Sequence, residues 1–162
     1  DVYKRQVTIL RNVQLRNSDP DMSHISVWNL TIWIEKQSWT LLLKSNKNVD
    51  KVHYLGLVSK DSPEYEIIQK QYSSPGGMIS FDVKGGEKEA FKFLDNLNLV
   101  KLAVSLGGTE SLACHPYSMT HADVNVDTKI NMGMGESLVR LSIGVEDADD
   151  LIDDIIGSLD TI

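Results

Sequence analysis

The chain has little of what several common protein classes require. Its 162 residues include a single cysteine, Cys114, so no disulfide can form within the chain, and a reducing compartment, the cytoplasm, is the simplest location. No apolar run approaches the roughly 20 residues of a membrane span, and no signal peptide is visible. The net charge of −7 at pH 7 disfavours nucleic acid and an anionic membrane surface as partners, because both require clustered Lys and Arg.

The hydrophobic share of 41% is enough for one domain with its own core. The chain starts at Asp1 rather than at a methionine, and residues 1–6 lead into no periodic pattern. They are interpreted as a scar or translated flanking sequence, and the chain as part of a longer protein. Residues 7–44 fit no template well, although part of them, 25–43, is compatible with a helix. The predicted domain covers residues 45–162.

From residue 45 onward, segments that alternate apolar and polar residues are interleaved with segments of helical period. The strands carry one apolar and one polar face, which is typical of a mainly antiparallel sheet covered by helices on one side. The predicted fold class is therefore α/β, of the two-layer α+β type. The expected elements are strand 49–55, helix 64–72, strand 78–83, helix 87–97, strand 100–106, strand 138–145 and helix 147–159.

Two details of these elements can be checked against a structure. In strand 100–106, Leu102, Val104 and Leu106 are expected to share the apolar face. The acidic residues Asp147 and Asp149 stand in the first turn of the last helix, where the helix dipole favours negative charge, so no ligand is needed to explain them.

Arg140 is the first candidate for a functional residue. It stands in mid-strand on the face opposite the apolar residues, and a guanidinium binds a carboxylate through two parallel hydrogen bonds. Its small neighbours Ser142 and Gly144 leave room for a ligand on that face. A solvated surface arginine is the more frequent alternative. Ser105, on the polar face at the end of strand 100–106, is likewise open between a ligand contact and a turn cap, with the turn favoured.

Other residues of catalytic type carry weaker signals. His115 and His121 lack the further ligands at fixed spacing that a zinc site requires. Nothing around Cys114 identifies a thiolate-stabilising site, so it is interpreted as a structural thiol. Gly133-Met134-Gly135 lacks the third glycine of a dinucleotide fingerprint. No combination of nucleophile, base and orienting residue stands out, so no catalytic residue is assigned.

Several separated motifs of the chain, taken together, carry a stronger signal. They are VHYLG at 52–56, GMISFDV at 77–83, KLAVSLGGTESL at 101–112, His115-Pro116, SMTHA at 118–122 and LVRLSIGVED at 138–147. In this order they resemble the C-terminal signature of the pyridoxal-phosphate-dependent enzymes of Cys/Met metabolism, which include methionine γ-lyase, cystathionine γ-lyase, cystathionine γ-synthase and O-acetylhomoserine sulfhydrylase. The resemblance runs from about residue 45 to residue 159 and implies the small C-terminal domain of an aspartate-aminotransferase-type (fold type I) enzyme.

The resemblance also implies roles for four residues. The arginine of the LVRLS motif, Arg140, would grip the α-carboxylate of the substrate, and the serine of the VSLG motif, Ser105, would assist at the same group. Thr120 of the MTH motif would orient the arginine. Cystathionine-handling members often carry an acidic residue at the position of Val104, so a valine there is more like methionine γ-lyase. The implied substrate is a sulfur-containing amino acid, and the implied state of the full-length parent is a homotetramer.

The chain departs from the family in its N-terminal part. The Ser-x-Thr-Lys-like motif with the lysine that bonds pyridoxal phosphate is absent, as are the aspartate and tyrosine that contact the cofactor ring. The cofactor is therefore expected on a part of the parent outside this chain, and the chain alone is expected to be inactive. Two alternatives stay open: a parent that acts on cystathionine or an O-acylhomoserine, and a non-catalytic α+β module that binds a small molecule.

Overall fold

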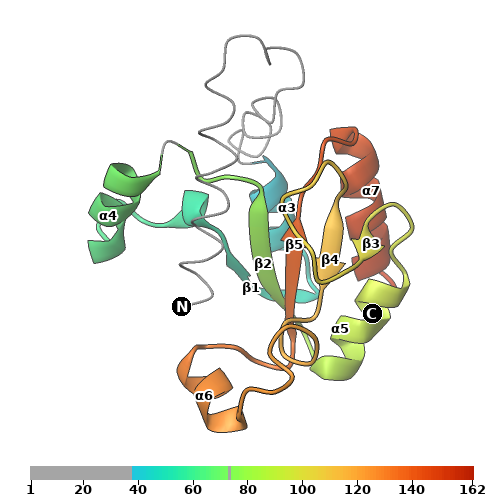
Figure 1. The fold of residues 1–162 in the computed structure, drawn as a ribbon. Coiled ribbons are helices and arrows are strands. Elements are labelled where there is room, and N and C mark those ends of the chain that lie inside the picture. The colour runs from blue at the N-terminus through green and yellow to red at the C-terminus, as the bar shows by residue number, and fades with distance from the viewer. Residues whose placement is uncertain (1–37, 73) are drawn as a thin grey trace.

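The computed structural model describes residues 38–72 and 74–162 (Figure 1). The flanking segment 1–6 and most of the helix considered over 25–43 lie outside the described residues. At the described end of that region, helix α3 spans Ser38–Ser45. Leu43 of this helix is fully buried in the core, so α3 packs with the elements that follow residue 45.

The remaining elements follow the predicted order, with two additions besides a short 3-10 helix. They are β1 (Val49–His53), the short 3-10 helix η2 (Leu55–Leu57), α4 (Pro63–Gln71), β2 (Met78–Val83), α5 (Glu87–Asp95), β3 (Lys101–Leu102), β4 (Leu112–Cys114), α6 (Val126–Asn131), β5 (Leu138–Ser142) and α7 (Ala148–Leu159). The sequence did not predict β4 and α6. Neither is long enough to show a period: β4 has three residues and α6 has six.

The strands form one five-stranded sheet in the order β1-β2-β5-β4-β3. The pairs β1–β2, β2–β5 and β5–β4 are antiparallel, and only β3–β4 is parallel. The sheet is thus mixed but mainly antiparallel, as predicted. Strand β5 lies at its centre, between β2 and β4.

The core lies between one face of this sheet and helices α5 and α7, which pack side by side (Figure 1). On β2 the predicted alternation is confirmed, with Ile79, Phe81 and Val83 buried. Helices α4 and α6 add no apolar side chain to the core. The core residues from the two covering helices are Ala90, Phe93, Leu94, Leu151, Ile155 and Leu159.

Helix starts follow the signals in the sequence. Ser62 accepts a hydrogen bond from the backbone N–H of Glu64, and Pro63 occupies the first turn of α4, where a missing N–H costs nothing. At α7, the carboxylate of Asp147 accepts from the N–H groups of Asp149 and Asp150. The acidic cluster therefore caps and stabilises the helix, as the dipole argument predicted.

The predicted strand 100–106 is wrong in its length and in its apolar face. Only Lys101 and Leu102 pair in the sheet, and Leu102 and Val104 are 46% and 55% exposed. β3 is an edge strand, and the chain leaves it after Ala103, whose N–H still donates to the carbonyl of Ala113. Gly107, with φ of 72°, then helps to turn the chain back toward β4.

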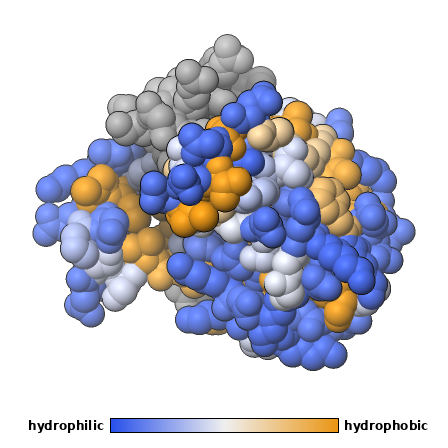
Figure 2. All heavy atoms as spheres, turned by 90° about the horizontal axis from the view of Figure 1, so that it is seen from below, coloured by the Kyte–Doolittle hydropathy of each residue, from blue (hydrophilic) through white to orange (hydrophobic). Residues whose placement is uncertain are grey.

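Hydrophobic side chains also reach the surface away from the core. Viewed from below, orange patches stand over α6 within a mostly hydrophilic face (Figure 2). Val126, Ile130 and Met132, on and just after α6, are all exposed. Among the described residues, no helix is long and apolar enough to cross a membrane.

Candidate functional site

The sheet face opposite the helices carries the candidate residues. Ser80, Arg140 and Cys114 are paired positions on β2, β5 and β4, so their side chains form one row across this face. Val139 and Leu141, the neighbours of Arg140 in the chain, point into the core and are fully buried. Arg140 therefore lies opposite the apolar face, as its position in the sequence predicted.

Arg140 is nevertheless not a surface residue. Its side chain is only 6% exposed, so the solvated-surface interpretation is wrong. Alternation along β5 could not reveal this burial, because the polar face of this central strand is covered by a segment distant in the sequence. Residues 103–111, between β3 and β4, lie over Arg140 and Ser142.

Backbone carbonyls hold the guanidinium. Nη2 of Arg140 donates to the carbonyl of Val104 at 3.0 Å and to that of Ser105 at 3.2 Å. Among the described residues, no carboxylate lies within ion-pairing distance of Arg140. Both of these hydrogen bonds leave from the same nitrogen, and a guanidinium has five N–H donors. The Nε and Nη1 groups have no partner among the described residues.

Val104 and Ser105 contact Arg140 through their main chains, whereas the roles suggested for them involve their side chains. Their main-chain oxygens make the contact, and both side chains are exposed. Ser105 is not the end of a strand but part of the covering segment 103–111. The suggested contact of its hydroxyl with a substrate carboxylate therefore stays a prediction.

Thr120 lies in a separate turn. Its hydroxyl donates to the carbonyl of Pro116 at 3.3 Å and lies 2.7 Å from Nδ1 of His121. These bonds stay within residues 116–121, so the suggested role of Thr120 in orienting Arg140 stays a prediction.

The other polar side chains of catalytic type have structural partners. His115 is fully buried between the Ser118 hydroxyl, 2.6 Å from Nδ1, and the carbonyl of Glu136, 2.7 Å from Nε2. Burial raises the pKa of the Cys114 thiol, and the charge of Arg140 only partly opposes this effect. A raised pKa disfavours the thiolate, which agrees with a structural thiol. Within the described part of the chain, no group of His, Cys, Asp and Glu could hold a metal ion.

Sequence reasoning missed a His–Asp pair on the same sheet face. The carboxylate of Asp82 accepts from Nε2 of His53 at 2.7 Å and from the Ser137 hydroxyl at 3.1 Å. The hydrogen bond from His53 is the main reason that the pKa of Asp82 lies below its usual value. The signal was present as alternation, because Ser80 and Asp82 share a face of β2, but nothing in the sequence links His53 to them.

Sequence reasoning also misjudged the space around Arg140. The room expected over Ser142 and Gly144 is filled by the chain itself. The Ser142 hydroxyl accepts from the N–H of Gly107 at 2.9 Å. A Cβ on Gly144 would lie 2.3 Å from the carbonyl oxygen of Thr109, so glycine is required by the close approach of two main chains.

Comparisons with known proteins agree with this architecture. The chain is 46% identical over 113 residues to L-methionine gamma-lyase of Pseudomonas putida, a match that covers 70% of this chain and 28% of that protein. It is 43% identical over 118 residues to cystathionine gamma-lyase of Dictyostelium discoideum, covering 73% of this chain and 30% of the relative. The chain thus spans about a third or less of the length of these relatives.

Solved structures show the same fold. The crystal structure of cystathione gamma lyase from Micromonospora echinospora matches with a TM-score of 0.71 and 37% identity, over 79% of this chain and 33% of that one. Cystathionine gamma synthase from Xanthomonas oryzae, solved in complex with cystathionine, matches with a TM-score of 0.70. The family model described as Cys/Met metabolism PLP-dependent enzyme matches residues 36–160. The chain therefore belongs to the family of pyridoxal-phosphate-dependent enzymes of Cys/Met metabolism.

Proposed function

We propose that this chain is the C-terminal, substrate-carboxylate-binding domain of a pyridoxal-phosphate-dependent carbon–sulfur lyase or γ-replacement enzyme. The observation that carries the proposal is the buried Arg140. Its guanidinium is held along one edge by the carbonyls of Val104 and Ser105 and has no carboxylate partner among the described residues. Burial of a positive charge without a negative partner is costly. An α-carboxylate that accepts from Nη1 or from Nε would supply the missing charge.

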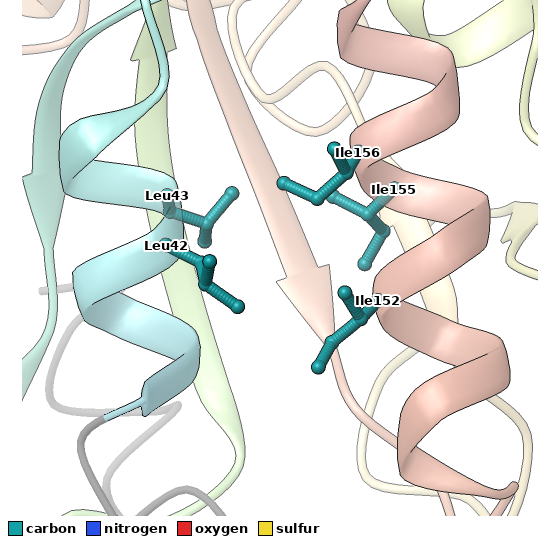
Figure 3. Close-up of a pocket in the computed structure, with 5 residues that line it drawn as sticks. All are labelled: Leu42, Leu43, Ile152, Ile155 and Ile156. Atoms are coloured by element: carbon teal, nitrogen blue, oxygen red, sulfur yellow. The ribbon is translucent and has the colours of Figure 1, made fainter.

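The described residues do not by themselves fit the cofactor. An imine-forming lysine needs surroundings that lower its pKa, such as an apolar pocket. All described lysines other than Lys129 are exposed, and the Lys129 ammonium already makes a cation–π contact, 4.2 Å from the centre of the Tyr117 ring. The pocket between α3 and α7 is lined only by aliphatic side chains, Leu42, Leu43, Ile152, Ile155 and Ile156 (Figure 3), and offers nothing to a phosphate.

The cofactor would therefore be held by a part of the parent outside this chain, where it supplies the electron-withdrawing ring for cleavage or exchange at the sulfur-bearing carbon. The contribution of this domain is orientation. A carboxylate fixed by Arg140, with the Ser105 hydroxyl beside it, would hold the amino acid in one pose, and such positioning lowers the entropic part of an activation barrier.

Methionine is the substrate that we favour. Val104 is 55% exposed and its carbonyl binds Arg140, so its side chain stands next to the proposed carboxylate site. An apolar side chain there suits a thioether better than the second ammonium and carboxylate groups of cystathionine. The likeness to methionine gamma-lyases supports this choice, although cystathionine gamma-lyases match at similar identity. We further propose that the parent is a cytoplasmic homotetramer, which size-exclusion chromatography with light scattering of the parent would check.

The proposal is tested on the chain itself by NMR. The side-chain N–H signals of Arg140, assigned by their loss in Arg140→Met, should shift on addition of L-methionine, with a dissociation constant in roughly the millimolar range. L-methionine amide, which lacks the carboxylate, should leave them unchanged. Equal shifts with acid and amide, or no shift with either, would refute carboxylate binding at Arg140.

A second measurement tests whether the cofactor is held outside this chain, as proposed. The chain mixed with pyridoxal phosphate and L-methionine should release no methanethiol. Turnover together with the absorbance band of a lysine imine would mean that this chain holds its own cofactor site, and the proposed role as a binding domain would then be wrong.

A further inference from the structure

The covering segment 103–111 determines how the Arg140 guanidinium is oriented. Among the described residues, every hydrogen bond of the guanidinium ends on this segment. Yet most of its side chains are exposed and contribute nothing to the core. The segment must therefore be held in place by specific polar contacts rather than by burial.

Those contacts come from the residues at the end of β5 and just beyond it. The carboxylate of Glu146 accepts two hydrogen bonds from Ser111: one from its N–H to Oε1 and one from its hydroxyl to Oε2, both at 2.7 Å. The Ser111 hydroxyl in turn accepts from the N–H of Gly144 at 2.7 Å. Ser111 is 1% exposed and Glu146 is half-buried, so this network is partly shielded from water.

Two main-chain contacts complete the attachment. The N–H of Val145 donates to the carbonyl of Thr109 at 2.9 Å, and Gly144 allows the two main chains to approach to a distance that no Cβ would permit. Together with the bond from Gly107 to Ser142, they anchor the segment on both sides of its turn. Among the residues that the structure describes, Glu146 supplies the only charged group of this attachment, and hydrogen bonds to a charged group are the stronger kind.

We propose that Glu146 and Ser111 are positioning residues for the carboxylate site. They hold segment 103–111 so that the carbonyls of Val104 and Ser105 fix Nη2 of the Arg140 guanidinium and leave its remaining N–H groups to the α-carboxylate of an amino acid. This role rests on the proposed function of Arg140 and adds residues that do not touch the ligand. Loss of these Glu146–Ser111 hydrogen bonds, termed the clamp, leaves Arg140 in the same row of the sheet but no longer fixed in orientation.

The test uses the 162-residue chain and three variants. Glu146→Gln keeps the shape of the side chain but can no longer accept both bonds from Ser111, and Ser111→Ala removes the hydroxyl. Asp147→Asn is the matched control: it removes the same charge one residue away, and asparagine still caps α7. Each variant is titrated with L-methionine and with L-methionine amide, while the Arg140 side-chain signals and the methyl signals of Leu141 are followed.

The clamp variants should bind L-methionine roughly tenfold more weakly, the size of one lost hydrogen bond to a charged group. Without ligand, their Arg140 signals should move or broaden while the Leu141 methyl signals stay in place, since only the covering segment is released. Asp147→Asn should match the wild type in both respects. The rescue variant Ser111→Thr, which retains the hydroxyl, should recover most of the affinity.

The outcomes separate the two proposals. If wild type binds the acid but the clamp variants bind it equally well with unchanged Arg140 signals, the positioning role is refuted and carboxylate binding stands. If the affinity falls only in step with a collapse of the Leu141 methyl signals, the clamp is merely structural and the positioning role is again refuted. If wild type does not bind, carboxylate binding fails, and the ligand-free Arg140 signals still decide whether Glu146 and Ser111 orient the guanidinium.

Discussion

Replacement of Arg140 by methionine should leave the fold as stable as before. Arg140 is only 6% exposed, and the partners of its guanidinium among the described residues are two carbonyl oxygens. Hydrogen bonds to a charged group contribute about 1.5–3 kcal/mol each, whereas desolvation of a buried ion costs several kcal/mol. The two contributions nearly cancel. Methionine has a similar length and no charge to desolvate, so the free energy of unfolding should equal or exceed that of wild type.

The measurement is urea unfolding of both proteins at pH 7, followed by circular dichroism. Replacement of a comparable buried charged group by an apolar side chain is neutral or stabilises by about 1–4 kcal/mol. Leu141→Ala is the control in the same strand: its side chain faces the core and is fully buried, so its loss should cost about 2–5 kcal/mol. Arg140→Met should at the same time abolish binding of L-methionine.

A clear loss of stability in Arg140→Met would refute this reasoning. If the variant lost more than about 3 kcal/mol, as happens when one partner of a buried ion pair is removed, the bonds from Nη2 to the covering segment would be stabilising the fold. The burial of Arg140 would then need no ligand to explain it, and the main support for the carboxylate site would be gone.

Three further substitutions test other parts of the structure. Asp82→Asn should destabilise the chain at pH 6, and the difference from wild type should vanish as the pH falls below about 4. The hydrogen bond from His53 lowers the pKa of Asp82, so the stability that the carboxylate contributes is present above its unfolded-state pKa and is lost as the pH falls through its folded-state pKa. Urea unfolding at several pH values would measure this difference. Gly144→Ala should cost more than about 1 kcal/mol because its Cβ meets the main chain of Thr109. Gly157→Ala, in α7 with nothing within 4 Å of the added Cβ, should instead raise stability by about 0.5–1 kcal/mol, and thermal unfolding of both would show the opposite signs.

Sequence patterns predicted well the elements that have one buried and one more solvent-exposed face over several residues. β2 alternates buried and half-buried positions along all of Met78–Val83. α7 buries Leu151, Ile155 and Leu159 at helical spacing and is capped by Asp147. In such segments the apolar residues recur with the same period as the buried positions, so the sequence pattern and the tertiary structure agree.

Sequence patterns failed where the burial of successive residues does not follow the period of a strand or a helix. The apolar residues of segment 100–106 alternate as a strand would, yet only Lys101–Leu102 pairs, because the segment stands at the sheet edge and departs from it. Val104 and Leu102 are consequently exposed. The three-residue strand β4 is buried at every position and therefore has no alternation to detect.

The proposed carboxylate site shows a further limit of prediction from sequence. The groups that contact the Arg140 guanidinium are main-chain carbonyls, and every residue has a carbonyl. The identities of Val104 and Ser105 therefore could not predict this contact. What the sequence does encode is the set of residues that fixes the main chain there. Gly144 cannot be replaced by a larger residue without a clash, and Ser111 and Glu146 form a hydrogen bond across 35 residues of the sequence. A site built from backbone atoms is therefore better sought through the residues that hold the backbone than through residues that resemble ligand contacts.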